Sequence, residues 1–456
     1  MTDSSRGSSD SGNSANTQIS ITSATLESQD DRQSDTAVME SRESPVPIPA
    51  PNQRPAAWRQ TFSSLSNRNF LFLWLGMLAL MAGMQMQMLA RGYLVFEITG
   101  SASLLGIVNA GMAIPMLSLS LFGGAFADRI ERKRIIQMGQ AGSFVIALVV
   151  GLFIISGYIT WQYLFIASII QGAMFSFMMP ARQAIIPQLV GSEKLSNAMA
   201  LNAAAMSSMT LIAPGIAGVL YAYAGAHNVY FVIAGLAGIS FIFTSLIPKT
   251  GATVKSKGPM GKEIWAGLVY IRQSHMVLVL LVMGLATTLF AMPFRMLMPV
   301  FVVDVYHLGP ESMGLLTAIM GGGSLAGALF IAAIGNWRRG MLLIIGSFAS
   351  GIALVLLAVF PIYMAATVIM ILLGLGDAGR RSLNQSLIME EVEDQYRGRV
   401  MSVFMMNFGL MPLGVLPTGL LADYIGPQPA IGLLGILMLI TATAVILTQK
   451  RLRELN

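Results

Sequence analysis

Long apolar stretches separated by short polar connections follow one another along the chain from Asn69 onward. Each is about 20 residues long, the length that a helix needs to cross a hydrocarbon core about 30 Å thick. Lipid offers the backbone no hydrogen-bond partners, so we expect helices, and the runs lack the alternation of outer-membrane barrel strands. The pattern predicts twelve membrane-spanning helices: 69–94, 103–127, 135–157, 161–181, 198–222, 229–248, 276–302, 312–334, 341–360, 362–384, 400–422 and 430–448.

The two halves of the chain resemble each other weakly. Gly172–Val190 aligns on Gly374–Val392, and the stretch at Gly106 aligns on the stretch at Gly314, which places Asp128 on Asn336. Internal repeats with a site between them are typical of transporters, although a repeat can also be a relic of gene duplication. We predict an all-α integral membrane protein with two pseudo-symmetric six-helix bundles. The predicted parts are a disordered cytoplasmic tail (1–56), the bundles (57–248 and 276–448), a cytoplasmic connector (249–275) and a short basic tail (449–456).

The first 56 residues differ sharply from the rest. They contain almost no apolar clusters and end in the proline-rich run Pro45–Pro51, so they cannot bury enough surface to offset the entropy of ordering. No cleavable signal peptide is visible in this polar segment. A regulatory docking role is the alternative to a plain disordered tail.

Composition and charge narrow the class of protein further. The chain is 55% hydrophobic and 11% charged, whereas an average soluble domain carries about a quarter charged residues. The net charge of +6 does not indicate nucleic acid, because the basic residues sit in short loops between the apolar runs. There is no cysteine, and the three histidines have no metal-ligand spacing, so we expect neither a cofactor nor a metal.

The lysines and arginines also predict the orientation. With twelve helices, both termini lie on one side, and every Lys and Arg except Arg91 and Arg295 falls on that side. Because cytoplasmic loops are enriched in these residues, both termini are predicted to be cytoplasmic.

The connection between the second and third predicted helices carries the sharpest local motif, Gly124–Arg134. Gly124 lets a neighbouring helix approach closely, and Asp128 can pair with a base or accept hydrogen bonds from the N-terminus of another helix. Arg129 and Arg132 belong to a basic run that can hold the loop against anionic lipid. A charge cluster that only sets topology is the alternative interpretation.

This loop resembles the characteristic loop motif of the major facilitator superfamily. Four more segments resemble one branch of it, which contains the bacterial enterobactin exporter and macrolide-efflux-like (transmembrane secretion effector) proteins: Leu94–Ser101, Pro180–Pro187, Asn197–Asn202 and Arg397–Ser402. The resemblance covers about residues 69–448. It implies the major facilitator fold, secondary transport, and a gating role for Gly124, Asp128, Arg129 and Arg132. It does not name the cargo, because one fold carries many functions.

The chain also departs from that family's pattern. Met84 follows Gly83 where many relatives have an acid, and Asn336 replaces the acid of the second-half loop. The helix-5 motif reads Ala213-Pro214 in place of Gly-Pro, with Gly218 retained. These departures argue against proton antiport through the usual residues.

Two arginines lie inside predicted helices at matching places of the two halves. Charged side chains within a membrane are costly and need a reason. Arg91 and Arg295 either reach the outer headgroups or pair with Glu97 and Asp304, or they form a cationic ring at the mouth of a cavity that attracts anionic or catecholate-like cargo.

A methionine-rich segment of the first helix, Met84–Met88, contains Gln85 and Gln87. We predict that both glutamines belong to the substrate cavity with Arg91 and Arg295. Methionine is flexible and polarisable, so a methionine-lined cavity can accept several apolar cargoes, but methionine also serves as lipid-facing filler.

Asp377 is the one acid deep in a predicted helix, and Arg380 and Arg381 follow it by three and four positions. The spacing allows ion pairs on one helix face. The alternative is a protonation site for proton coupling, whose charge change biases the two access states.

These features together predict a secondary active transporter in the inner membrane of a bacterium. By alternating access it exports a small amphipathic molecule, drug-like or siderophore-like, using an ion gradient, expected to be H⁺. No nucleotide-binding loop is visible, so ATP is not the direct driver. A lipid or lysolipid flippase on the same fold is the alternative. A membrane enzyme is disfavoured for lack of clustered His, Cys or paired carboxylates, and a receptor or scaffold for lack of a large soluble domain. We expect a monomer whose partners are its cargo, the coupling ion and lipid, with no nucleic acid.

Overall fold

The structure, a computed structural model, describes residues 63–127, 131–248, 269–335, 338–393 and 396–454. Asp128, Arg129, the predicted tail 1–56 and most of the predicted connector lie outside the described residues. Contacts gather Pro55–Asn456 into one compact unit, so the division into two bundles stays a prediction. We call Arg68–Ser245 the N-terminal half and His275–Thr448 the C-terminal half.

Every element of the described part is helical. The elements of the N-terminal half and the turn before it are η1 (Ser63–Ser66), α2 (Arg68–Thr99), α3 (Ala102–Ala127), α4 (Arg132–Ile155) and α5 (Trp161–Ser245). Those that follow are α7 (His275–Ala286), η2 (Thr287–Ala291), α8 (Met292–Val300), η3 (Phe301–Val305), α9 (Pro310–Ile334), α10 (Arg339–Val359), α11 (Tyr363–Glu391), α12 (Arg397–Gly409), α13 (Met411–Ile425), α14 (Pro427–Thr448) and α15 (Lys450–Glu454).

Two glycines divide the long α5 into the three segments that the sequence predicts there. Gly191 has φ +72° and Gly225 has φ +82°, a left-handed conformation that glycine adopts without steric cost. The first segment continues beyond its predicted end at residue 181, because Ile185 and Ile186 are buried in an apolar cluster of the N-terminal half. The chain therefore turns at Gly191 rather than at the end of the apolar run.

Prolines interrupt two helices that the sequence predicts as continuous. The segment from His275 contains π-helical turns in η2 and η3, next to Pro293 and Pro299. Proline lacks a backbone donor, and local π-helical adjustment lets a membrane helix continue past it. The predicted helix 400–422 is likewise divided at Leu410, directly before Met411-Pro412.

Within the described residues, ten helical segments are long and apolar enough to cross a membrane. One of these, Lys194–Ser245, contains the break at Gly225, and the shorter apolar α13 continues α12 across a twelfth position. The structure is thus an all-α integral membrane protein, and its segments are consistent with the predicted count of twelve.

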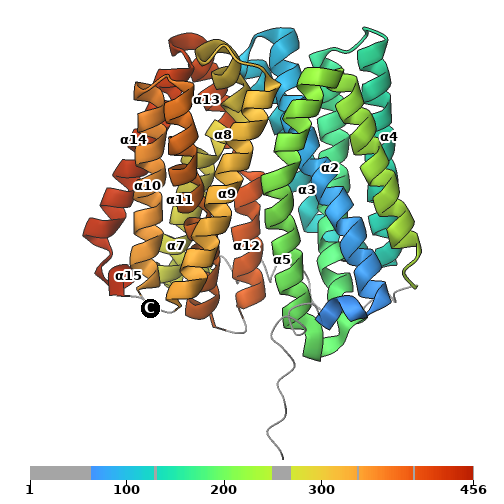
Figure 1. Cartoon of the computed structure of the whole chain (residues 1–456). Coiled ribbons are helices and arrows are strands. Elements are labelled where there is room, and N and C mark those ends of the chain that lie inside the picture. Colours follow the sequence, from blue (N-terminus) through green and yellow to red (C-terminus); the bar gives the residue numbers. More distant parts are fainter. Residues whose placement is uncertain (1–62, 128–130, 249–268, 336–337, 394–395, 455–456) are drawn as a thin grey trace, which may run out of the picture. The chain divides into compact units, whose positions relative to one another are not determined.

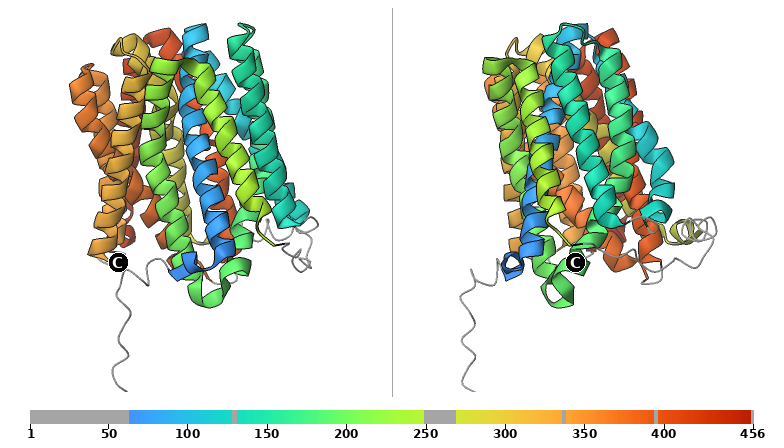
Figure 2. Two further views of the ribbon diagram at one scale, coloured as in Figure 1. Left: turned by 45° about the vertical axis from the view of Figure 1, so that its right-hand side comes forward. Right: turned by 90° about the vertical axis from the view of Figure 1, so that its right-hand side faces the viewer.

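The helices run between two ends of the unit (Figure 1). η1 and α15 lie at the same end, which we call the terminal end; the other is the opposite end (Figure 2). The N- and C-terminal halves meet where α5 packs along α9 and where α3 packs along α13.

The buried core differs between the two ends. Toward the opposite end, one apolar cluster joins both halves and includes Val95, Leu105, Phe301 and Leu316. Toward the terminal end, each half has its own main cluster in the described residues, around Phe70, Ile135 and Ile185 in one and around Val277, Leu343 and Ile388 in the other. The halves are therefore held together mainly at the opposite end.

Candidate functional site

One face of α2 lines a cavity between the two halves. Gln85, Met88, Leu89 and Gly92 line it together, because residues spaced by three, four and seven positions lie on one side of a helix. Gln85, one of the four residues that the sequence predicts for the substrate cavity, therefore lines this cavity. Its role in binding stays a prediction.

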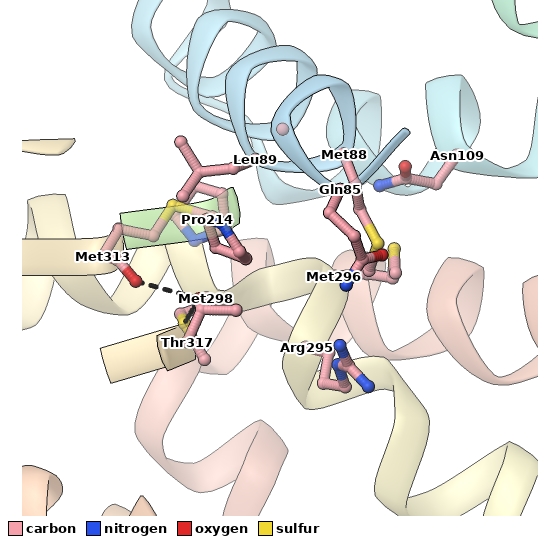
Figure 3. A pocket seen from close by; sticks show the side chains of 12 residues that line it. Gln85, Met88, Leu89, Asn109, Pro214, Arg295, Met296, Met298, Met313 and Thr317 are labelled. Atoms are coloured by element: carbon pink, nitrogen blue, oxygen red, sulfur yellow. Dashed lines mark hydrogen bonds between the residues drawn. The ribbon is translucent and has the colours of Figure 1, made fainter. Parts of the chain in front are cut away.

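The rest of the lining comes from four further helices. Asn109 of α3 and Pro214 of α5 complete the N-terminal side, and the C-terminal half contributes Arg295, Met296, Met298, Pro299, Met313 and Thr317. Figure 3 shows Gln85 and Met88 close to Met296. The cavity volume is about 20 Å³, room for about one water molecule and not for an organic cargo.

The lining is apolar in character with a few polar groups. Four methionines contribute thioether surface, and the Thr317 hydroxyl lies 3.3 Å from the sulfur of Met298 and 2.8 Å from the carbonyl oxygen of Met313. Thioethers adapt to irregular shapes, which suits a cavity that must change with its contents.

Gln87 and Arg91, two more of the residues predicted for the substrate cavity, lie on another side of α2. Among the described residues they do not line this cavity but are buried within the N-terminal half, at 6% and 7% exposure. Arg91 donates to Gln171 over 3.1 Å, and Gln171 donates in turn to Gln87. The reason is helical periodicity, since Gln87 and Arg91 lie about 200° around α2 from Gln85 and Leu89. The expected partner of Arg91, Glu97, instead accepts a hydrogen bond from Tyr221.

Arg295 lies in the cavity, partly exposed, without a hydrogen bond or ion pair among the described residues. The charges of Asp377 and Arg381 act on it. Asp304, one of the partners that the sequence allows for Arg295, forms no ion pair with it among the described residues. Of the alternatives for Arg295, the structure thus does not form the pairing with Asp304, and the charges of Asp377 and Arg381 on α11 act on Arg295 instead.

Asp377 is buried and holds the two arginines that follow it. Its carboxylate pairs with Arg380 at 3.4 Å and with Arg381, as the spacing predicts. Arg380 also donates from Nε to the carbonyl oxygen of Gly376 over 3.1 Å, whereas its Nη1 is buried without a partner among the described groups. A role of Asp377 in proton coupling stays a prediction.

The predicted gating loop is described only in part. Gly124 belongs to the helical backbone of α3, and Asp128 and Arg129 lie outside the described residues. Arg132, at the first position of α4, is buried and donates to the carbonyl oxygen of Ala184 over 2.7 Å. Arg132 therefore ties α4 to α5 within the N-terminal half, and the gating role of the loop stays a prediction.

The helix-5 motif lies at the contact between the halves. A Cβ added to Gly218 would meet the carbonyl oxygen of Pro310 at 2.5 Å and the Cα of Gly314 at 2.9 Å. Only glycine lets α5 and α9 approach so closely. Pro214, one turn earlier, lines the cavity, so this motif both seals the halves together and shapes the cavity wall.

A second contact between the halves escaped the sequence analysis. Asp423, near the end of α13 and beyond the predicted span, accepts hydrogen bonds from Ser101 Oγ at 2.8 Å, Ala102 N at 2.8 Å and Ser103 N at 2.9 Å. Burial would raise the pKa of Asp423, but the hydrogen bonds from Ser103, Ser101 and Ala102 outweigh it and lower the pKa. The carboxylate thus caps the first turn of α3, where the helix dipole favours a negative charge.

Other lining residues were also missed, among them Asn109, Met296 and Thr317. Asn109 and Thr317 are polar residues within apolar helices, a signal that could have selected them. Nothing in the sequence shows that Met296 faces the same cavity.

Fold and site together define an all-helical membrane protein with a cavity shared by two halves of one chain. The family model of the Major Facilitator Superfamily matches residues 73–414. The chain belongs to this superfamily.

The proteins that this chain resembles in sequence include efflux transporters. The chain is 28% identical over 376 residues to macrolide efflux protein A of Streptococcus pyogenes, covering 78% of this chain and 90% of the relative. It is 25% identical over 339 residues to the enterobactin exporter of Citrobacter koseri, covering 72% and 76%. A crystal structure of a mutant nucleoside transporter NupG shares the fold, with a TM-score of 0.71 and 14% identity over 84% of this chain and all of that one. The chain is thus a transporter with efflux homologues, and no enzymatic family is indicated.

Proposed function

We propose that this protein exports a small amphipathic molecule, drug-like or siderophore-like, by alternating access. We further propose that an ion gradient, carried by H⁺, drives export, and that the protein lies in the inner membrane of a bacterium with both termini in the cytoplasm. The names of the relatives support export, and the distribution of Lys and Arg supports the orientation.

The observation that carries the proposal is the unequal packing of the two ends. One core joins the halves toward the opposite end, and separate clusters lie toward the terminal end. Packed interfaces switch between discrete arrangements rather than deforming continuously. A molecule whose halves are joined at one end has the geometry for rocking about the cavity between them.

The size of the cavity supports a moving site. A volume of about 20 Å³ cannot hold an organic molecule, so cargo binds only when the lining helices separate. The methionine side chains in the lining can repack around different apolar shapes, which fits relatives named for different cargoes.

Asp377 is the carboxylate that we propose for proton coupling. It is buried, it faces the charges of Arg295, Arg380 and Arg381, and residues 84 and 336 carry no acid. A proton on Asp377 would release Arg381 and change the charge near the cavity. None of the relatives reported above is named as a lipid transporter, and we do not propose the flippase alternative.

The test is transport by purified protein in proteoliposomes under an imposed pH gradient. Erythromycin is the first cargo, because one relative is named for macrolides. We expect wild-type transport to follow the pH gradient and Asp377→Asn to lose that dependence. Glu390→Gln is the matched control, because Glu390 is an exposed carboxylate of α11 that pairs with Arg339. Equal gradient dependence in both variants would contradict the coupling role, and transport unaffected by any ion gradient would contradict secondary transport.

A further inference from the structure

The charged groups around Asp377 carry a net positive charge. Three guanidinium groups, those of Arg381, Arg380 and Arg295, act on the single carboxylate of Asp377. Arg380 and Arg381 pair with that carboxylate, which leaves Arg295 without an acidic partner among the described residues. The cluster therefore carries a surplus of positive charge within the membrane-spanning part of the molecule.

Such a surplus is unfavourable unless something compensates it. A cation removed from water loses hydration, and an unpaired one at membrane depth needs an anion or water to stabilise it. Neither of the two more accessible guanidiniums is fully enclosed, since Arg295 is partly exposed and the Arg381 side chain is 41% exposed. Arg295 can thus donate to a further group without breaking the pairs of Asp377 with Arg380 and Arg381.

We propose that Arg295 forms an anion subsite that binds the acidic group of an amphipathic organic cargo, and that the positive charge of Arg381 strengthens it. This inference rests on the proposed transport function and specifies its cargo class. Guanidinium groups donate two parallel hydrogen bonds to carboxylate, sulfonate or phosphate oxygens, which gives both affinity and orientation.

The neighbouring lining matches the rest of such a cargo. Met88, Met296 and Met298 offer thioether surface for an apolar body, and Gln85 adds an amide that can donate or accept. A cationic cargo would meet the same surplus charge as repulsion. The arrangement therefore selects an acid with an apolar body over its neutral or cationic counterpart.

An anionic phospholipid carries the same chemistry in its headgroup. We commit to a free organic acid, because the cavity beside Arg295 lies between the two halves, lined by α2, α3, α5, α8 and α9. The experiment separates the two sources by its lipid arm.

The test is binding to the purified full-length protein in nanodiscs, measured by calorimetry and by ligand-induced thermal shift. The probes are β-naphthoate, its neutral isostere β-naphthamide, and β-naphthylmethylamine. Charge-assisted hydrogen bonds predict that naphthoate binds at least about tenfold more tightly than naphthamide, with the amine weakest. Arg295→Gln should remove most of this preference, Arg381→Gln should weaken it, and Arg295→Lys should retain part of it. Arg134→Gln, at a side chain 69% exposed, is the control and should change nothing.

The outcomes are distinguishable. Three results would each contradict the proposed subsite. They are equal affinity for naphthoate and naphthamide, a preference for naphthoate that survives Arg295→Gln, and no binding of any probe. A protein that is more stable in phosphatidylglycerol than in phosphatidylcholine nanodiscs and shows no response to naphthoate is a further outcome. That result would assign the subsite to a lipid headgroup and contradict the proposal as well. An acid preference without transport in proteoliposomes would keep the subsite and remove the transport function. Equal transport of acidic and neutral cargo would keep the transport function and contradict the subsite.

Discussion

Asp423→Ala removes a set of hydrogen bonds that joins α13 of the C-terminal half to the first turn of α3 in the N-terminal half. Three donors converge on this carboxylate at 2.8–2.9 Å. The contact lies at the opposite end and crosses between the halves, so it exists only while that end is closed. Its loss should therefore shift the population toward molecules open at the opposite end.

The magnitude follows from the geometry. Removing a capping carboxylate costs about 0.5–2 kcal/mol, and the exposure of Asp423 to water places the value near about 1 kcal/mol. Because the whole loss of free energy falls on the state that is closed at the opposite end, the population open at that end should rise about fivefold.

The absence of cysteine from the sequence makes the assay direct. Thr317→Cys places one thiol in the cavity wall, and a membrane-impermeant maleimide is applied from the side of the opposite end. Asp423→Ala should accelerate labelling about fivefold over the Thr317→Cys background. Glu390→Ala also removes a carboxylate and an ion pair, but within the C-terminal half, and should leave the rate unchanged. Unchanged labelling in Asp423→Ala, or an equal increase in Glu390→Ala, would refute the reasoning.

Two further predictions concern the same closed end. The ratio of the Thr317→Cys labelling rates with and without Asp423→Ala should be the same at pH 8 and pH 5. The lowered pKa of Asp423 keeps the contact intact above its ordinary value and loses it only as the pH falls through the lowered one, and the ratio cancels the pH dependence of the thiolate itself. A ratio that falls toward one at pH 5 would argue against this carboxylate as the closing group. Gly218→Ala should lower thermal stability by about 1–3 kcal/mol, because its methyl group would overlap Pro310 and Gly314. Gly235→Ala, where nothing lies within 4 Å of the added Cβ, is the matched control, and similar melting temperatures for the two variants would contradict the close packing of α5 and α9.

Much of the fold could be predicted because each membrane segment carries its own signal. A helix must be apolar over its full length to lie in lipid, so span positions follow from the local sequence. The predictions failed where packing overrides that signal. The helix before Gly191 continues past its apolar run, since Ile185 and Ile186 have partners to bury against, and Pro293 and Pro299 introduce π-helical turns that hydropathy does not register.

The types of residue at the site could be predicted from the sequence, but the direction in which their side chains point could not. Gln85 and Arg295 line the cavity as polar residues in apolar segments suggest, and Pro214, predicted only as part of the helix-5 motif, lines it as well. Gln87 and Arg91 carry the same local signal and point into the N-terminal half. The helical period separates Gln85 from Gln87, but only the position of the neighbouring helices decides which face meets the cavity.

The sequence by itself determined that the chain spans a membrane as helices, and which ionisable residues lie at membrane depth. It also determined the pairing of Asp377 with Arg380 and Arg381, because partners three and four positions apart share a helix face whatever the tertiary structure. Only the tertiary structure decided that Arg295 lies beside that cluster while Arg91 does not, and that Asp423 caps a helix more than 300 residues earlier in the chain. Such contacts depend on how separate helices dock, and docking is set by close packing along whole helices, as at Gly218 and Gly314, which no local stretch of sequence encodes.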